Sequence, residues 1–179
     1  MSGAPGAEFP PLTRMLLQAD GSTTLMLEAL LEAPLSLVLL EQRTCSAVAL
    51  PERVRRGLAS VDGDQVVRRR SELHTVTARP ISRNEVTVSC RNAELASILT
   101  DTRVPIGHGL LAARRFLGRT VLATGLGYWR DADGSVQGRC AYKEYLLRDA
   151  TTVVAHIREQ FDPEVVPVAA VLVPQGAPR

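Results

Sequence analysis

The sequence predicts an α+β domain built around an antiparallel sheet. Segments with strand patterns follow one another through short turns between Leu35 and Phe161, and segments with helical patterns are grouped before and between them. The chain has 179 residues, of which 45% are hydrophobic and 22% charged, as is usual for one globular domain. Strands that succeed each other without crossover helices favour antiparallel pairing.

Two short helices are predicted at the start of the chain. The first covers Leu12–Gln18 and ends at Asp20-Gly21. Ser22 is a suitable N-cap for a second helix over Thr23–Glu32, since its hydroxyl can accept a hydrogen bond from a free backbone N–H. Leucines give this helix an apolar face, and Pro34 ends it.

The next part of the chain predicts three strands. Leu35–Thr44 is rich in Leu and Val and is typical of a buried strand. Gln65–Ala78 has a long strand pattern, which Pro80 interrupts. Asn84–Cys90 alternates between apolar and polar residues, so we expect it to return as the second strand of a hairpin.

The second half of the chain predicts two helical segments and three further strands. In order these are a helix over Asn92–Thr100, a helical turn after Pro105-Ile106-Gly107, strands over Phe116–Leu126 and Gly138–Leu147 joined by a turn at Asp131–Gly134, and a strand over Thr151–Phe161. The last segment is ambiguous by periodicity, but its β-branched beginning favours a strand.

We expect one domain over residues 12–173 with flexible ends at 1–11 and 174–179. Both ends are rich in Gly, Pro and Ala and offer no periodic apolar face. The first residues lack the basic and apolar regions of a signal peptide, and no apolar run approaches the roughly 20 residues of a membrane span. We therefore expect a cytoplasmic protein without a membrane partner.

Composition argues against nucleic acid, metal and redox chemistry. The net charge is only +2 and aromatic residues are 4% of the chain, so neither a basic stripe nor a base-stacking platform is predicted. The cysteines are far apart and the histidines isolated, without the spacing of metal ligands. We expect no cofactor and no metal, a small-molecule partner, and a monomer or small homo-oligomer.

Two features could carry chemistry. The run Arg68–Arg70 stands inside an apolar strand, and alternation places Arg69 on one face of the sheet and Arg68 and Arg70 on the other. These arginines either form a solvated edge face or bind a carboxylate through two parallel hydrogen bonds. Glu159 is the second candidate, and its alternative is an exposed end of a strand or helix.

Six short segments occur in an order and spacing that is informative when they are taken together. They are LLQADGSTT at 16–24, VVRR at 66–69, SRNEV at 82–86, VPIG at 104–107, AYKEY at 141–145 and IREQFDP at 157–163. On these segments the chain resembles the chorismate lyase family, especially its actinobacterial-type 4-hydroxybenzoate synthase branch. The resemblance extends from about Leu12 to Pro163.

The resemblance implies a six-stranded antiparallel sheet whose helices and flap segments cover a buried ligand site. It implies a lyase that eliminates pyruvate from chorismate to give 4-hydroxybenzoate without a cofactor. Arg68 would bind a substrate carboxylate, and Glu159 would be the catalytic glutamate, acting as a base or as a hydrogen-bond partner. The substrate-binding positions that it implies are Ser22, Ser82, Arg83, Ile106 and Gly107.

Three alternatives remain open at this stage. The product could be 3-hydroxybenzoate, or the same fold could serve secondary metabolism by a cyclisation or elimination on another substrate. The chain could instead be a non-catalytic domain that binds or senses a small aromatic acid. Transcription regulators use this fold next to a DNA-binding domain, and the residues before Leu12 are too few for a helix-turn-helix. The last alternative therefore predicts a free-standing sensor.

Overall fold

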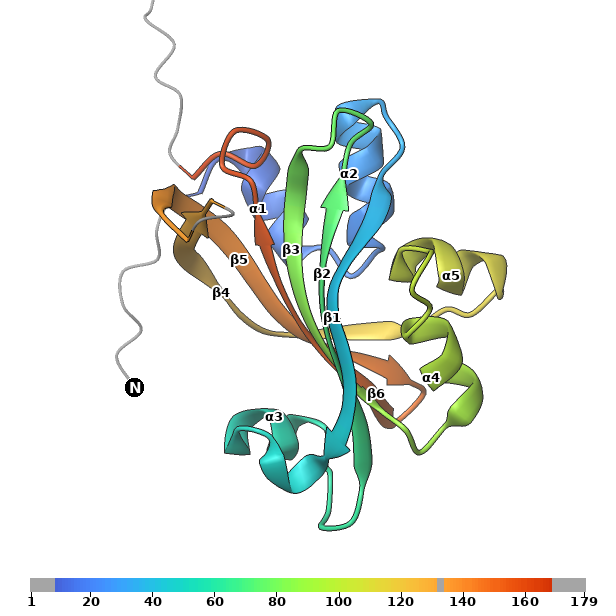
Figure 1. The fold of residues 1–179 in the computed structure, drawn as a ribbon. Helices are drawn as coiled ribbons and strands as arrows, with labels where there is room; N and C mark the ends of the chain where they lie inside the picture. Colours follow the sequence, from blue (N-terminus) through green and yellow to red (C-terminus); the bar gives the residue numbers. More distant parts are fainter. Residues whose placement is uncertain (1–8, 132–133, 169–179) are drawn as a thin grey trace, which may run out of the picture.

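One antiparallel sheet organises the molecule. The fold comes from a computed structural model, which describes residues 9–131 and 134–168. The sheet has six strands in the order β1-β2-β3-β6-β5-β4, and every neighbouring pair is antiparallel (Figure 1). The predicted α+β class with a single six-stranded antiparallel sheet is confirmed.

The elements follow the predicted order. The strands are β1 Ser36–Ser46, β2 Gln65–His74, β3 Pro80–Ser89, β4 Gly118–Arg130, β5 Val136–Asp149 and β6 Thr152–Phe161. The helices are α1 Pro11–Gln18, α2 Thr23–Leu31, α3 Glu52–Gly57, α4 Ala93–Leu99 and α5 Ile106–Ala112, with a 3-10 turn η1 at Ala47–Ala49. The turn η1 and helix α3 were not predicted, because such short and polar segments show no helical periodicity.

The connection between β2 and β3 lies four residues earlier in the chain than the sequence predicts. β2 ends at His74 instead of Ala78, and Ala78 has a left-handed backbone with φ 60° in the turn that follows. β3 begins at Pro80, because the first residue of a strand tolerates a missing backbone N–H. The two strands therefore pair over almost their whole length.

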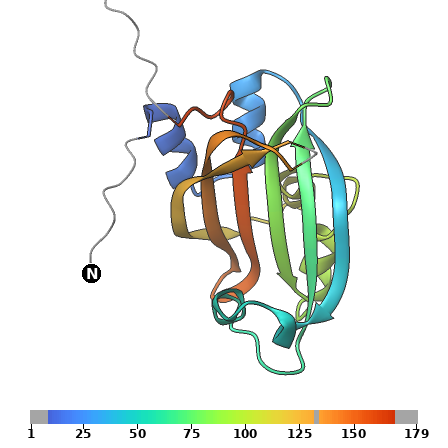
Figure 2. The same cartoon turned by 60° about the vertical axis from the view of Figure 1, so that its left-hand side comes forward.

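The two faces of the sheet are covered differently. Helices α1, α2, α4 and α5 lie on one face, and α3 lies on the other face at one end (Figures 1 and 2). On the first face one apolar cluster gathers around α4 and α5, and another gathers under α1 and α2. A third and smaller apolar cluster packs α3 against the sheet. The alternation of β6 directs Ile157, Glu159 and Phe161 toward the first face, so Glu159 stands between core side chains.

Part of the expected N-terminal tail belongs to the fold. Phe9 is buried in the cluster under α1 and α2, and α1 begins at Pro11. The hydroxyl of Thr13 donates to the carbonyl of Pro167 at 2.6 Å, which connects α1 to the segment after β6. The rest of the expected tail, residues 1–8, and the expected C-terminal tail, 174–179, lie outside the described residues. Across the described ranges, no helix combines the length and apolar character needed to cross a membrane.

Candidate functional site

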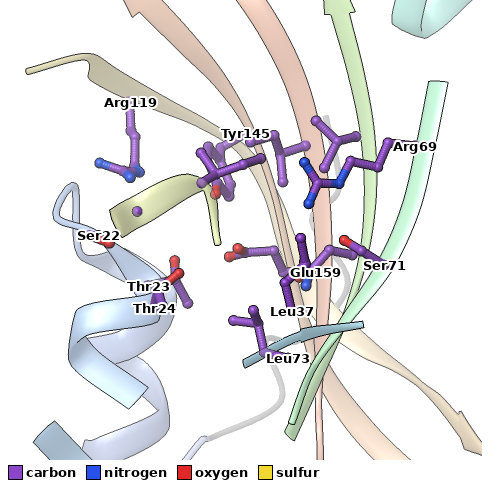
Figure 3. A pocket seen from close by; sticks show the side chains of 15 residues that line it. Ser22, Thr23, Thr24, Leu37, Arg69, Ser71, Leu73, Arg119, Tyr145 and Glu159 are labelled. Atoms are coloured by element: carbon purple, nitrogen blue, oxygen red, sulfur yellow. The ribbon is translucent and has the colours of Figure 1, made fainter. Parts of the chain in front are cut away.

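A polar cavity lies on the helix-covered face of the sheet, where the two larger apolar clusters meet. Its lining residues are Ser22, Thr23, Thr24, Leu37, Arg69, Ser71, Leu73, Asn84, Val86, Ile106, Gly107, Arg119, Tyr145, Ile157 and Glu159 (Figure 3). The enclosed volume is about 30 Å³, which is room for roughly two water molecules. A larger ligand therefore requires that part of the wall move.

The beginnings of α2 and α5 form one part of the wall. Ser22 is the N-cap of α2 and accepts a hydrogen bond from the backbone N–H of Leu25 at 3.5 Å, as predicted from the sequence. Gly107 in the first turn of α5 lies directly against Ser22 and Thr24, and a Cβ at this position would overlap the Ser22 hydroxyl. The two helices thus close over the cavity by a contact that only glycine permits.

Arg69 enters the cavity from the sheet (Figure 3) and is 2% exposed. Its Nη1 donates to the carbonyl of Leu99 at the end of α4 at 3.0 Å. Its Nε and Nη2 are buried and have no hydrogen-bond partner among the residues that the structure describes. These two nitrogens form one edge of the guanidinium, the geometry that holds a carboxylate through two parallel hydrogen bonds. Burial lowers the pKa of Arg69, and the charge of Asp101 opposes this shift.

Glu159 supplies an acceptor in the same cavity. The side chain is buried, and its Oε2 has no hydrogen-bond partner within the described part of the chain. Burial raises the pKa of Glu159, while a hydrogen bond from Thr23, the charges of Lys143 and Arg119 and a hydrogen bond from Tyr145 oppose the shift. An unpaired buried acceptor costs free energy, so this oxygen favours a ligand that carries a hydrogen-bond donor.

Two further cations make the surroundings of the cavity positive. Lys143 is fully buried beside Glu159 in the register of β5 and β6, and it donates to the carbonyls of Leu16 and Ala19. Burial lowers the pKa of Lys143, and Glu159 opposes this. Arg119 donates to the carbonyl of Asp20 at 2.8 Å, and its Nε is buried without a partner in the described ranges. Lys143 and Arg119 act on Glu159, and Arg69 lines the same cavity, so basic groups outnumber the one carboxylate and the site favours an anion.

Four of the predicted site residues line this cavity. They are Ser22, Ile106, Gly107 and Glu159. Arg68 does not line it, because strand alternation turns Arg69 toward the cavity and Arg68 toward the opposite face of β2. The arginine of the site is therefore one position further along the chain than expected.

The predicted pair Ser82 and Arg83 also lies outside the lining. Ser82 is buried on the helix-covered face, where its hydroxyl donates to Oδ1 of Asn84 at 3.4 Å. Arg83 points to the opposite face, where its Nε donates to Glu72 at 2.8 Å and its guanidinium lies 4.4 Å from the centre of the Trp129 ring. Both residues support the sheet next to the cavity.

Three residues at the cavity were not predicted from the sequence. Arg119, Lys143 and Tyr145 come from β4 and β5, which the chain order places far from Arg69. Lys143 carried little signal, because polar and charged residues such as Arg139 and Glu144 accompany it in the same strand. Among the described residues, no group of three or more His, Cys, Asp or Glu could hold a metal ion.

Helices α2 and α5 are joined by a histidine–glutamate pair. Nε2 of His108 lies 2.8 Å from Oε2 of Glu28, whose Oε1 accepts from the backbone N–H of Leu35. We expect His108→Ala to lower the stability by about 0.5–1.5 kcal/mol and to accelerate amide hydrogen exchange in the first turns of both helices. His74→Ala is the control, because it removes a similar pair with Glu72 on the opposite face. Unchanged exchange in α5 of the His108 variant would contradict this function of the pair.

Comparisons with known proteins agree on the fold. No protein-family model matches the chain, and no curated protein matches it in sequence. Among solved structures, PhnF from Mycobacterium smegmatis matches with a TM-score of 0.60 at 13% identity over 88% of this chain and 71% of PhnF. The separate effector domain of PhnF matches with a TM-score of 0.58 at 12% identity over 80% of this chain and 90% of that domain.

Two further structures carry the same fold. The ligand-binding domain of a GntR-family transcriptional regulator from Bordetella bronchiseptica has a TM-score of 0.55 at 14% identity, over 72% of this chain and 85% of that domain. The C-terminal domain of the histidine utilization repressor from Pseudomonas syringae has a TM-score of 0.55 at 13% identity, over 78% of this chain and 99% of that domain. At these identities the matches establish a shared fold.

These comparisons correct the expectation of a chorismate lyase. The descriptions of two of these structures name a transcriptional regulator and a repressor, and none of the four names a lyase, so the expected family, the lyase activity and its classification as an enzyme are wrong. The short segments that suggested the lyase family contribute to the wall of the cavity. Proteins with different functions can share a cavity of this architecture. The fold was therefore predicted correctly from a resemblance whose reaction does not carry over.

Proposed function

We propose that this chain is a non-catalytic domain that binds a small organic acid in the cavity beneath α2 and α5. The proposal agrees with the names of the matching structures, which describe an effector domain and a ligand-binding domain. It also agrees with the excess of positive charge around the cavity, because a desolvated site of this charge attracts an anion. Of the alternatives left open by the sequence, the sensing domain is the one that these observations favour.

One observation carries the proposal. Within a single cavity, the Nε and Nη2 of Arg69 lack an acceptor and the Oε2 of Glu159 lacks a donor, among the described residues. A ligand with a carboxylate at one end and a hydroxyl at the other satisfies both. The wall between them includes Val86 and Ile157, so an apolar ring fits the middle of the ligand. A hydroxylated aromatic acid has all three features.

Isothermal titration calorimetry tests this proposal with ligands that differ from one another in a single functional group. We expect saturable one-to-one binding of 4-hydroxybenzoate or 3-hydroxybenzoate. Benzoate, which leaves the Glu159 oxygen unpaired, should bind about 5- to 150-fold more weakly, the equivalent of about 1–3 kcal/mol. 4-Hydroxybenzyl alcohol, which has no carboxylate, should not bind measurably, and chromatography should recover every ligand unchanged.

Three outcomes of these experiments would contradict the proposal or a part of it. Equal binding of 4-hydroxybenzyl alcohol and 4-hydroxybenzoate would show that the carboxylate is not recognised. Absence of binding by all of the acids at millimolar concentration would exclude the ligand class. Chemical conversion of a bound acid would contradict the non-catalytic part of the proposal.

A further inference from the structure

A second cleft lies on the opposite face of the sheet, next to α3. Its volume is about 260 Å³, several times that of the cavity under α2 and α5. In the sheet register Arg43, Arg68, Thr87 and His156 form one row across β1, β2, β3 and β6, and all four residues line this cleft. Arginines outnumber glutamates along its wall. The cleft is therefore a positively charged depression in a polar sheet face.

Arg68 is the unbalanced charge in this row. It is half-buried, and it makes no hydrogen bond or ion pair with any residue in the described ranges. Its direct cross-strand neighbour is Arg43, and like charges in this position destabilise a sheet. The nearby glutamate on β1 is already engaged, because Glu41 lies 3.1 Å from Arg43 and 3.8 Å from Arg70.

Glu144, the acid on the other side of the cleft, also has ion-pair partners already. Glu144 is buried, and it accepts from Nε2 of His156 at 2.8 Å. The same carboxylate pairs with Arg53 from α3 and lies 3.5 Å from Arg158. Glu85 also lines the cleft, but its side chain is exposed and forms no ion pair with Arg68. Because the nearby carboxylates have other partners, the positive charge of Arg68 remains available to bind an anion from solution.

We propose that this cleft is a second binding site, which accepts an oxyanion of a small molecule, either a phosphate or a carboxylate. Arg68 binds the oxyanion, and the hydroxyl of Thr87, its cross-strand neighbour, supplies a further donor. Arg68 and Arg69 are consecutive in β2, but alternation directs them to opposite faces of the sheet. Arg69 and Val86 also border this cleft, but the Arg69 guanidinium lies on the helix-covered face, where it donates to the carbonyl of Leu99. The two proposed sites therefore use different arginine side chains, and neither proposal depends on the other.

NMR titrations at constant ionic strength test the second site with inorganic phosphate and with succinate. We expect saturable shifts of the Arg68, Thr87 and His156 amides with at least one of the probes, and the probe that binds more tightly identifies the oxyanion. Arg68→Gln should weaken this binding at least about tenfold, since a charged hydrogen bond is lost. The control Arg103→Gln should change it less than threefold, because Arg103 is exposed, paired with Asp101 and outside the lining of the cleft.

A third variant separates the two proposals. Arg69→Met should retain the phosphate or succinate shifts while it loses the aromatic acid. Non-saturable shifts, or equal weakening by the Arg68 and Arg103 variants, would overturn the second site in favour of general charge attraction. Self-association that Arg68→Gln abolishes, measured by analytical ultracentrifugation, would also overturn it and would make this face an interface between copies.

Discussion

Replacing Arg69 with Met should abolish binding of a hydroxybenzoate while the domain remains folded. The guanidinium holds the only buried pair of adjacent unpaired N–H groups among the described residues, and it faces the cavity. Removing one partner of a buried, hydrogen-bonded charge pair costs about 2–5 kcal/mol of binding free energy. The dissociation constant should therefore rise at least about 30-fold.

The stability of the unbound variant separates lost binding from lost folding. Two N–H groups of Arg69 are desolvated without a partner in the described chain, and replacing a buried charge by an apolar side chain of similar length is often neutral or stabilising. The hydrogen bond to the Leu99 carbonyl is lost, which offsets part of this gain. We expect the Tm of the unbound protein to be unchanged or higher.

Two controls accompany this variant. Arg68→Met changes the neighbouring residue on the opposite face, and it should leave hydroxybenzoate affinity within threefold of the unmodified protein. Arg69→Lys keeps the charge but loses the paired N–H edge, so it should restore only part of the affinity. If Arg68→Met also prevented binding of the aromatic acid, the assignment of the two faces would be wrong.

The choice between Arg68 and Arg69 shows which part of the site can be predicted from the sequence and which part cannot. Alternation predicted correctly that the two arginines lie on opposite faces, but it could not say which face carries the cavity. That choice depends on where the helices pack, which is a tertiary property. A shift of one residue in a strand reverses the face, so short motif matches place a strand residue less reliably than a helix cap such as Ser22.

The order of strands in the sheet was the other part that the sequence could not provide. Hairpins between consecutive strands follow from turn residues, and they account for β2-β3 and for β4-β5-β6, whereas β1 and β2 are connected through η1 and α3. The pairing of β3 with β6 joins segments far apart in the chain, and it brings Asn84 beside Glu159. Lys143 of β5 lies beside Glu159 through the pairing of the consecutive strands β5 and β6, and it comes near Arg69 only because β6 pairs with β3.

The fold was predicted correctly from the sequence and the function was not, and this difference has a physical reason. Ser22, Ile106, Gly107 and Glu159 occupy the expected places because they form the closing helices and the floor of the cavity. A cavity that binds an acid needs these features whether or not it changes the ligand. The residues that predicted the fold therefore did not discriminate a lyase from a sensing domain.

The contact between the closing helices gives the second prediction with a large effect. Gly107→Ala should destabilise the domain, because the new Cβ would overlap the Ser22 hydroxyl and press on Thr24 at 3.1 Å. Relief requires that Ser22 abandon its capping position or that α5 move away from α2. Overpacking of this kind costs about 1–3 kcal/mol, and the Tm should fall by about 2–12 °C for a domain of this size.

Gly109→Ala in the same helix is the matched control. The nearest atom to its new Cβ would be Cγ2 of Ile98 at 3.4 Å, an ordinary contact, and alanine is favoured over glycine inside a helix by up to about 1 kcal/mol. This variant should be as stable as the unmodified protein or more stable. Equal Tm values for the Gly107 and Gly109 variants would show that α5 does not press on the α2 cap.

The same pair of variants tests how a ligand enters. The volume of about 30 Å³ is too small for an aromatic acid, so the proposed ligand requires a wider cavity, and we expect α2 and α5 to separate before it binds. Gly107→Ala weakens the closed arrangement and raises the fraction of open molecules, whereas Gly109→Ala does not. Stopped-flow measurements should therefore show faster association of 4-hydroxybenzoate with the Gly107 variant alone. Equal association rates for both variants would mean that the ligand reaches Arg69 by a route that leaves the two helices in contact.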